Sequence, residues 1–373
     1  MTQPQQTSPA TLSGIHVYPI KSIRGIELSS AWVEKQGLSF DRRLMLATSD
    51  GVMVTARKYP QLVLVKAALT STGLVLTYPG KESLHLEYAN FKMQPTEAVV
   101  WSDSFTAYTV DDVADEWFSD LLEEQVALLY TGQDSNRLRE KLGHNVSFAD
   151  GYPLLIISQA SLDALNARST EVHKMAQFRP NIVVSGTEAF AEDSWKRFKV
   201  GDVEFEVMKP CERCILTTIE TNSGKKRANR EPLKTLGKFR ANEFGQVFFG
   251  QNVRALNEGV IEAGAEVEVL EYQEPVHYRD QELEAVQVSQ LTIVIDGVEI
   301  EGNNRDPLLN QAEAQGVKMR SSCRSGLCGA CKVKVTEGQV KQPDAPAITD
   351  DEKVQGFALA CCCVPETNIS VQA

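Results

Sequence analysis

Cysteine is absent from the first 210 residues of this 373-residue chain. The eight cysteines fall in two places, a pair at Cys211 and Cys214 and a group near the carboxyl terminus: Cys323, Cys328, Cys331, Cys361, Cys362 and Cys363. A disulfide framework would spread its cysteines through the fold, whereas clustered thiols are typical of metal sites or redox groups. The sequence therefore predicts two sites built around cysteine and no disulfide-stabilised scaffold.

The sequence also lacks an excess of basic residues and any long apolar run. With 38 Lys and Arg against 50 Asp and Glu, the formal net charge is -12, which argues against general affinity for nucleic acid or anionic membranes. No stretch approaches the roughly 18 to 20 apolar residues that span a bilayer. The first residues, MTQPQQTSPAT, contain no basic residue and no apolar core, so they predict no signal or transit peptide. We expect a cytoplasmic protein with neither a nucleic-acid polymer nor a membrane as partner.

Two familiar signals of oxidoreductases and metal sites are missing as well. The chain contains no G-x-G-x-x-G dinucleotide fingerprint and no flavin-binding pattern, so NAD(P)H is not expected to be oxidised on it. The five histidines show no ligand spacing and are expected to be structural or exposed: His16, His85, His144, His173 and His277.

The pattern of apolar residues divides the chain into segments. Up to about residue 110, short runs with β-like alternation are separated by turn residues such as Asp50 and Gly51, which predicts antiparallel strands. Helical spacing follows at Val113, Trp117 and Leu121. We expect a multidomain, mainly β protein with α/β elements, divided into residues 12–129, residues 130–272, a polar and acidic linker at 273–288, and residues 289–373.

The last segment opens with a clear hairpin pattern. The runs QLTIVI and VEI flank the turn Asp296-Gly297, which predicts two antiparallel strands. A helix is expected to open at Asp306 and Pro307, and one face of it is expected to carry Leu308, Leu309 and Ala312.

The cysteines of this segment have the spacing of iron-sulfur ligands. Cys323-x4-Cys328-x2-Cys331 is typical of plant-type ferredoxins, whose fourth thiolate comes from a distant position, here 30 residues later at Cys361. An anionic cluster needs backbone N–H groups close to its sulfurs, and two glycines allow that approach: Gly326 and Gly329. We predict a 2Fe-2S cluster. Free buried thiols are one alternative, and a zinc site is another, although its second C-x2-C would lie over a hundred residues upstream.

Spacing alone leaves the fourth ligand open among Cys361, Cys362 and Cys363. Residues 290–373 resemble plant-type ferredoxin domains over the hairpin, the helix and the final FALACCCVPETNISV. In such domains the fourth ligand precedes a proline by four positions, and Pro365 then selects Cys361. The resemblance implies that Cys362 and Cys363 are packing residues.

The other pair, Cys211 and Cys214, lies in the segment KPCERCILTT, and C-x2-C alone is weak evidence. It is compatible with a thioredoxin-like redox pair, with half of a zinc site, or with two small buried apolar residues. No long amphipathic helix follows the pair, which argues against the thioredoxin alternative. Arg213 between the cysteines would stabilise a thiolate, as a metal ligand requires. On these residues alone the alternatives stay open.

Four further motifs accompany this pair: YPIKSIRG, FDRRLMLA, FRPNIVVSG and AEDSW. Together with KPCERCILTT they resemble the MOSC family of molybdenum-cofactor proteins. The resemblance covers nearly the whole chain from Gly14 and extends to YcbX-type proteins, relatives of the mitochondrial amidoxime-reducing component. It implies a MOSC N-terminal β-barrel domain, a MOSC β-barrel domain and a β-grasp ferredoxin domain.

The resemblance also implies roles for individual residues. The second cysteine of the pair, Cys214, would be the catalytic residue and the protein ligand of molybdenum. The residues expected to line the molybdenum cofactor are Lys21, Ser22, Arg42, Gly151, Tyr152, Arg179, Cys211, Glu212 and Arg213. Because molybdopterin carries a phosphate and an anionic dithiolene, the basic residues of this set would form a local cationic pocket. Taken singly, each is compatible with a solvated charge or a structural ion pair.

The activity implied by the resemblance is reduction of N-hydroxylated compounds, such as hydroxylamines, amidoximes or N-hydroxylated base analogues. An external NAD(P)H-dependent flavoprotein reductase would supply electrons through the 2Fe-2S cluster. Two alternatives remain, a sulfur carrier with a persulfide on Cys214 and an electron-transfer adaptor. The family often has Asp where this chain has Glu220, and the loop 221–227 also departs from the usual sequence. We expect substrate preference to be hardest to predict at this loop.

Overall fold

The computed structural model describes residues 9–140, 143–169, 171–278, 289–304, 306–322, 326, 328–343 and 345–373. The chain divides into two compact units, with the boundary between residues 279 and 280. Strands predominate in both units, which confirms the expected mainly β fold class. No helix in the described ranges is long and apolar enough to cross a membrane.

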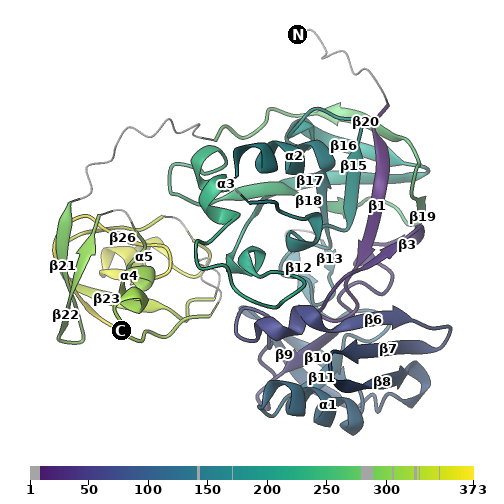
Figure 1. Ribbon diagram of the computed structural model, residues 1–373, viewed down its shortest axis with the longest axis horizontal. Helices are drawn as coiled ribbons and strands as arrows, with labels where there is room; N and C mark the ends of the chain where they lie inside the picture. Colours follow the sequence, from purple (N-terminus) through teal and green to yellow (C-terminus); the bar gives the residue numbers. More distant parts are fainter. Residues whose placement is uncertain are drawn as a thin grey trace. The chain divides into compact units, whose positions relative to one another are not determined.

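The first unit is built around a sheet that has eight strands within the described residues (Figure 1). Their order is β2 (Ile26–Leu28), β1 (Thr11–Val17), β15 (Ile182–Ser185), β14 (Leu154–Ser158), β18 (Phe248–Ala255), β17 (Val203–Glu212), β16 (Trp195–Val200) and β20 (Val267–Tyr272). β14 and β15 are parallel, and β1 pairs with β15 in the antiparallel sense. Strands from the amino-terminal segment therefore belong to the sheet of the segment that follows.

The central strand β14 shows why its sequence is a continuous apolar run. Leu154 and Ile156 pack into an apolar cluster on one face of the sheet, whereas Leu155 and Ile157 pack into another cluster. All five residues of the strand are buried. A strand covered on both faces needs apolar residues at every position, because successive side chains point to opposite faces.

Smaller sheets complete the first unit. One has the strand order β5 (Leu44–Ala47), β11 (Ala127–Tyr130), β10 (Asp103–Thr109) and β9 (Pro95–Val100), and a second has the order β6 (Lys66–Leu69), β7 (Gly73–Tyr78) and β8 (Lys81–Glu87). A third has the order β19 (Gly259–Glu262), β3 (Ser30–Glu34) and β4 (Gly37–Leu38), and the last is the pair β12 (Leu138–Arg139) and β13 (His144–Asn145). The pairing of β19 with β3 is a second link between distant parts of the sequence. These pairings explain why residues on both sides of position 130 lie in one compact unit.

The helices of the first unit are α1 (Asp112–Leu122), α2 (Gln159–Arg168) and α3 (Leu233–Phe239), with 3-10 helices η1 (Pro60–Leu64), η2 (Tyr88–Asn90), η4 (Met175–Gln177), η5 (Ala191–Ser194) and η6 (Ile215–Thr218). α1 confirms the helical spacing, but its buried face differs from the expected one. Val113 is 59% exposed, while Ala114, Trp117 and Phe118 are buried. Asp111 caps the helix by accepting from the Val113 N–H, which places Val113 in the first turn beside solvent.

The second unit contains the expected hairpin and helix. In its main sheet the described strands follow the order β22 (Val298–Asn303), β21 (Gln290–Ile295), β27 (Ile369–Gln372), β23 (Lys332–Glu337) and β25 (Phe357–Leu359), accompanied by the pair β24 (Val340–Lys341) and β26 (Val364–Pro365). The helices are α4 (Leu308–Ala314) and α5 (Asp350–Val354). Leu308, Leu309 and Ala312 are buried in the core of this unit, as predicted.

The first part of the expected linker packs against the first unit. The Gln273 N–H donates to the Ser194 carbonyl at 2.7 Å. The Tyr278 ring centroid lies 4.0 Å from the Arg240 guanidinium carbon and 5.7 Å from the Phe248 ring. Residues 273–278 are therefore part of the packed unit, and residues 279–288 lie outside the described residues.

Candidate cofactor sites

A cavity of about 140 Å³ in the first unit is lined by every residue that the resemblance assigns to the molybdenum-cofactor site. They are Lys21, Ser22, Arg42, Gly151, Tyr152, Arg179, Cys211, Glu212, Arg213 and Cys214. β17 carries Cys211 and Glu212 to the cavity, and Cys214 then opens η6. The fold thus brings together residues from separate segments of the sequence.

Three of these residues have left-handed backbone: φ is 76° at Ser22, 49° at Arg42 and 56° at Arg179. Such a backbone is unfavourable for residues other than glycine, and it persists where the surrounding structure fixes it. The Arg42 side chain is fixed here, because its Nη1 donates to Asp41 Oδ2 at 2.6 Å and to Asn181 Oδ1 at 2.9 Å. The strained backbone helps to direct cationic side chains to the cavity.

The buried ring of Tyr18 supports two of the guanidinium groups. The Arg42 and Arg179 guanidinium carbons lie 4.4 and 4.0 Å from its centroid. Burial raises the pKa of Tyr18 to about 12, so its ring stays neutral. Burial, together with the neighbouring Arg42, lowers the pKa of Arg179 to about 10, so Arg179 remains protonated at neutral pH. Both guanidinium groups therefore contribute positive charge.

Two charged residues of the cavity were not predicted, Arg57 and Asp150. Asp150 accepts from Lys21 Nζ at 2.5 Å and from Arg57 Nη2 at 3.1 Å. Burial lowers the pKa of Lys21 to about 8, although Asp150 opposes the shift. Burial alone would raise the pKa of Asp150, but Lys21 and Arg57 hold it well below its ordinary value. The sequence signal for Asp150 was its position next to Gly151, whereas nothing in the local sequence distinguishes Arg57.

The charges around the cavity fit an anionic cofactor. Two carboxylates, Asp150 and Glu212, face five basic side chains: Lys21, Arg42, Arg57, Arg179 and Arg213. Five minus two leaves three formal positive charges, in a chain whose net charge is -12. Nε of Arg213 is buried and has no hydrogen-bond partner in the part of the chain that the structure describes. A phosphate or dithiolene here would meet donors suited to anions.

The two cysteines differ in their surroundings. Cys211 Sγ accepts a hydrogen bond from Arg213 Nη1 at 3.0 Å, and its side chain packs against the apolar cluster that contains Phe178 and Phe249. Burial raises the pKa of the Cys211 thiol, while Arg213 opposes that shift. The Cys214 side chain lines the cavity and makes no capping hydrogen bond to η6. Cys214 is thus the better placed of the two to bind a metal.

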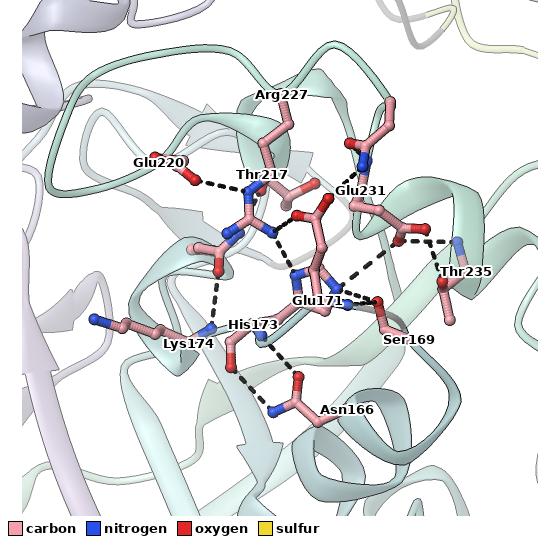
Figure 2. A network of polar contacts seen from close by, with 12 residues as sticks. Asn166, Ser169, Glu171, His173, Lys174, Thr217, Glu220, Arg227, Glu231 and Thr235 are labelled. Carbon is pink, nitrogen blue, oxygen red and sulfur yellow. Dashed lines mark hydrogen bonds and ion pairs between the residues drawn. The ribbon is translucent and has the colours of Figure 1, made fainter.

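The loop after Cys214 is held by a polar network around His173 and Arg227 (Figure 2). Arg227 Nη1 lies 3.0 Å from His173 Nδ1 and 2.9 Å from Glu171 Oε2. His173 Nε2 lies 2.8 Å from Ser169 Oγ. Because arginine only donates, His173 Nδ1 accepts from it and the ring proton lies on Nε2. The buried histidine is structural, as the sequence indicated.

The same arginine joins the two ends of the loop. Its Nε lies 3.3 Å from Glu220 Oε1, and its backbone N–H donates to the Thr218 carbonyl at 3.0 Å. The Glu220 N–H in turn donates to the Lys225 carbonyl at 2.9 Å. The loop from Glu220 to Arg227 therefore has a fixed base at the end of η6.

Stability is expected to fall on acidification because of His173. Burial, followed by Arg227, lowers its pKa below the ordinary 6.5, while Glu231 and Glu171 oppose the shift. As the pH falls through 6.5, the unfolded chain binds a proton that the folded chain does not, so the free energy of unfolding decreases until the lowered folded pKa is reached. Urea unfolding at a series of pH values measures this dependence.

The matched variant is His173→Gln, whose amide oxygen can still accept from Arg227 but which does not titrate. Its free energy of unfolding should decrease less than that of the wild type on going from about pH 7.5 to about pH 5. The same decrease in both proteins would show that His173 is not the titrating group.

The second cofactor site is described in part. Of its four expected ligands, Cys323 lies outside the described residues. Gly326 and Gly329 adopt left-handed backbone with φ of 75° and 71°, and a Cβ on Gly326 would come within 2.8 Å of Ala345 Cβ. The loop is therefore tight enough to require glycine, as a cradle for a cluster does. Among the described residues, which omit Cys323, no group of three or more His, Cys, Asp or Glu is arranged to hold a metal ion.

The three adjacent cysteines occupy different environments. Cys363 is fully buried in the core of the second unit. Cys362 Sγ packs against the loop backbone, 3.0 Å from where a Cβ on Gly326 would lie. Cys361 is half-buried, and its Sγ lies 3.4 Å from Cys362 Sγ. The burial of Cys363 suits a packing role, whereas Cys361 and Cys362 are both half-buried, so the choice between these two as the fourth ligand stays a prediction.

We expect Cys361→Ser to lose the intact cluster, because a serine hydroxyl replaces the fourth thiolate. Cys363→Ser places a hydroxyl in the core but leaves all four expected ligands, so its cluster should remain. Iron counting and visible absorption of the purified variants provide the measurement. If Cys361→Ser keeps an unaltered cluster while Cys363→Ser loses it, the ligand assignment is wrong.

Three family models match the chain in the expected order. They are the MOSC N-terminal beta barrel domain at residues 9–125, the MOSC domain at residues 143–268, and the 2Fe-2S iron-sulfur cluster binding domain at residues 292–366. The MOSC domain indicates a molybdenum cofactor, and the third domain indicates a 2Fe-2S cluster. Both cofactor predictions are confirmed.

Several curated proteins are similar to this chain. Mitochondrial amidoxime reducing component 2 of Rattus norvegicus is 35% identical over 248 residues, which cover 62% of this chain and 72% of the relative. Mitochondrial amidoxime-reducing component 1 of Homo sapiens is 32% identical over 283 residues, which cover 70% and 83%. Among solved structures, a ferredoxin reductase in carbazole 1,9a-dioxygenase matches 23% of this chain and 28% of its own, at 29% identity and a TM-score of 0.22.

The matches to relatives agree with the geometry of the first site. The two MOSC models together cover every residue that lines the cavity. The match to component 1 of Homo sapiens exceeds 30% identity and covers more than two thirds of that protein. The chain belongs to the family of MOSC-domain, molybdenum-cofactor oxidoreductases that includes the mitochondrial amidoxime-reducing components.

Proposed function

We propose that this chain reduces N-hydroxylated compounds, such as hydroxylamines, amidoximes or N-hydroxylated base analogues. The observation that carries the proposal is the cavity in which Cys214 lies beside five basic side chains. The names of the relatives, amidoxime-reducing components, support it. Each turnover breaks one N–O bond, forms one N–H bond, consumes two electrons and two protons, and releases one water.

The protein's own part in this reaction is to bind and orient the cofactor. Cys214 would ligate molybdenum through its thiolate, and Lys21, Arg42 and Arg179 would hold the anionic groups of the pterin. When bound, the cofactor supplies a centre that accepts an oxygen atom in one two-electron step. The hydrogen bonds that fix Arg42 and the ring that supports Arg179 keep these cations in place before the cofactor arrives.

Electrons are proposed to come from an external NAD(P)H-dependent flavoprotein reductase in the cytoplasm. The chain has no dinucleotide fingerprint of its own. Because a 2Fe-2S cluster carries one electron at a time, two transfers from the donor are required for each turnover. The four cysteines proposed for this relay are Cys323, Cys328, Cys331 and Cys361.

The test is anaerobic turnover of benzamidoxime by the full-length protein with a reduced viologen as electron donor. Benzamidine should form in proportion to the viologen oxidised, at two electrons for each product. Protein that contains both cofactors but forms no benzamidine, and reduces no hydroxylamine, would contradict the proposal.

A persulfide carrier is the alternative function. It would use the thiol of Cys214 but would leave the cationic wall of the cavity without a ligand. Among the described residues five basic side chains converge there, which a neutral or singly charged persulfide does not need. The geometry therefore favours the reductase.

A further inference from the structure

A second cavity, of about 270 Å³, adjoins the cofactor cavity. Arg179 and Leu216 line both cavities, and Leu216 lies two residues after Cys214. Ile219 and Thr221 of the following loop form part of its wall. The second cavity therefore shares a wall with the cavity that Cys214 lines, and it extends to the start of the loop 221–227.

The chemistry of this cavity changes from one part to another. Apolar side chains, Val63, Leu216 and Ile219 among them, contribute surfaces that suit an apolar molecule. Lys174, by contrast, contributes an exposed basic side chain to the lining. A ligand matching both would have an apolar body and an acidic group.

The charges of the lining favour an anion. Arg24, Lys174 and Arg179 are basic, and Glu27 is the carboxylate that opposes them. Arg24 is already used, because its Nη2 donates to Asn222 Oδ1 at 2.7 Å. The Lys174 backbone is bonded within the polar network, but its ammonium makes no hydrogen bond or ion pair with a described residue. Figure 2 shows the side chain extending away from the network.

Hydrogen bonds between the elements that line the second cavity hold its wall in place. Gln177 Nε2 donates to the Thr217 carbonyl at 3.1 Å, which ties η4 to η6. Arg227 fixes the base of the loop against buried His173, and Arg24 holds its tip. A cavity whose walls are fixed in this way is preformed, so a ligand does not have to order the loop when it binds.

We infer that this second cavity binds the body of the N-hydroxylated substrate and selects one with an acidic group, with Lys174 as the specificity-determining residue. The inference rests on the proposed function, because it assumes that the reacting N–O group lies at the Cys214 end. The apolar part of the substrate packs against Leu216 and Ile219. A carboxylate on the far side of the molecule lies near the Lys174 ammonium.

Two substrates that differ by one carboxylate provide the test. We compare kcat/KM for benzamidoxime and 4-carboxybenzamidoxime in full-length wild-type enzyme, Lys174→Glu and Lys225→Glu, with one chemical reductant throughout. Lys225 is the matched control, because it is an exposed lysine of the neighbouring loop that does not line the cavity. The ratio of kcat/KM for the two substrates cancels any effect of a variant on electron transfer from the reductant.

The wild type should prefer the carboxylated substrate. Lys174→Glu should lower that preference about threefold to tenfold through KM, because reversing the charge of this side chain replaces an attraction to the carboxylate by a repulsion. Lys225→Glu should leave the preference unchanged. Higher salt should reduce the preference of the wild type, because the pair is exposed to solvent. Equal changes in both variants, or no change in either, would overturn the inference.

The failure of the proposed function is distinguishable from the failure of this inference. A wild type that reduces neither compound contradicts the function. Equilibrium binding of the products, benzamidine and 4-carboxybenzamidine, needs no turnover and still tests the cavity. Lys174→Glu should weaken binding of the carboxylated amidine relative to benzamidine by about the same factor, since the ratio cancels the effect on the amidinium charge that both products carry. Unchanged dissociation constants for both would overturn the inference on their own.

Discussion

Cys214→Ala is expected to abolish the reduction of N-hydroxylated compounds, whereas Cys211→Ala keeps measurable activity. The Cys214 side chain lines the cavity without a capping hydrogen bond, so it is available as the metal's thiolate. The Cys211 thiol already accepts from Arg213 and packs among apolar side chains. Loss of the Cys211 thiol should lower the free energy of unfolding by about 1 kcal/mol, as expected for one small buried side chain, and should affect turnover less.

The measurement is turnover and molybdenum content of both purified variants. Cys214→Ala should lack turnover and hold less molybdenum, because a ligand has been removed. Thermal unfolding of Cys211→Ala serves as the control for its packing role. Equal loss of activity in the two variants, with molybdenum retained in Cys214→Ala, would refute the ligand assignment.

A chain truncated after Tyr278 is expected to keep molybdenum but lose turnover driven by the flavoprotein reductase. Every residue of the proposed molybdenum site lies in the first unit, which has apolar clusters of its own. The cluster ligands are removed with the second unit. A small artificial reductant should restore turnover, because the cluster serves as a relay and does not take part in oxygen transfer.

The place of truncation follows from the structure. The acidic composition predicts that the linker begins at residue 273, but Tyr278 packs on Arg240 and Phe248. Truncation after Tyr272 should therefore give a less stable protein than truncation after Tyr278, and comparing the two truncated proteins is a control for folding. Reductase-driven turnover at the full rate in the protein that ends at Tyr278 would show that the relay is not required.

Local patterns in the sequence were sufficient for several elements. The turn at Asp296 and Gly297 predicted the hairpin β21–β22, and Pro307 marked the start of α4. These features depend on neighbouring residues alone, which is why they are visible in one sequence. The exposed Val113 shows the limit of this reasoning, because helical spacing predicts that one face is buried but not at which residue that face begins.

Contacts between distant segments were not predictable in the same way. Arg57 reaches the cavity from a turn without a distinctive motif, and it meets Asp150 only because the chain folds back. The pairing of β1 with β15 likewise joins residues about 170 positions apart. The network of His173 and Arg227 depends on such pairing, so the sequence indicated a structural histidine but not its partner.

The proposed residues of the molybdenum site rested on family motifs, and the structure adds a physical reason for them. Ser22, Arg42 and Arg179 share a left-handed backbone that no local pattern announces. Their side chains converge with Arg213, whose buried Nε lacks a partner among the described residues. An anionic ligand accounts for this convergence better than separate surface charges do.

The most direct test of the central claim is the metal and pterin content of full-length protein made in a host that synthesises the molybdenum cofactor. We predict about one molybdenum, one pterin and two irons per chain. Cys214→Ala should have a lower molybdenum content and an unchanged iron content. Protein that contains the two irons but neither molybdenum nor pterin would contradict the account, because the cationic cavity would then have no cofactor to hold.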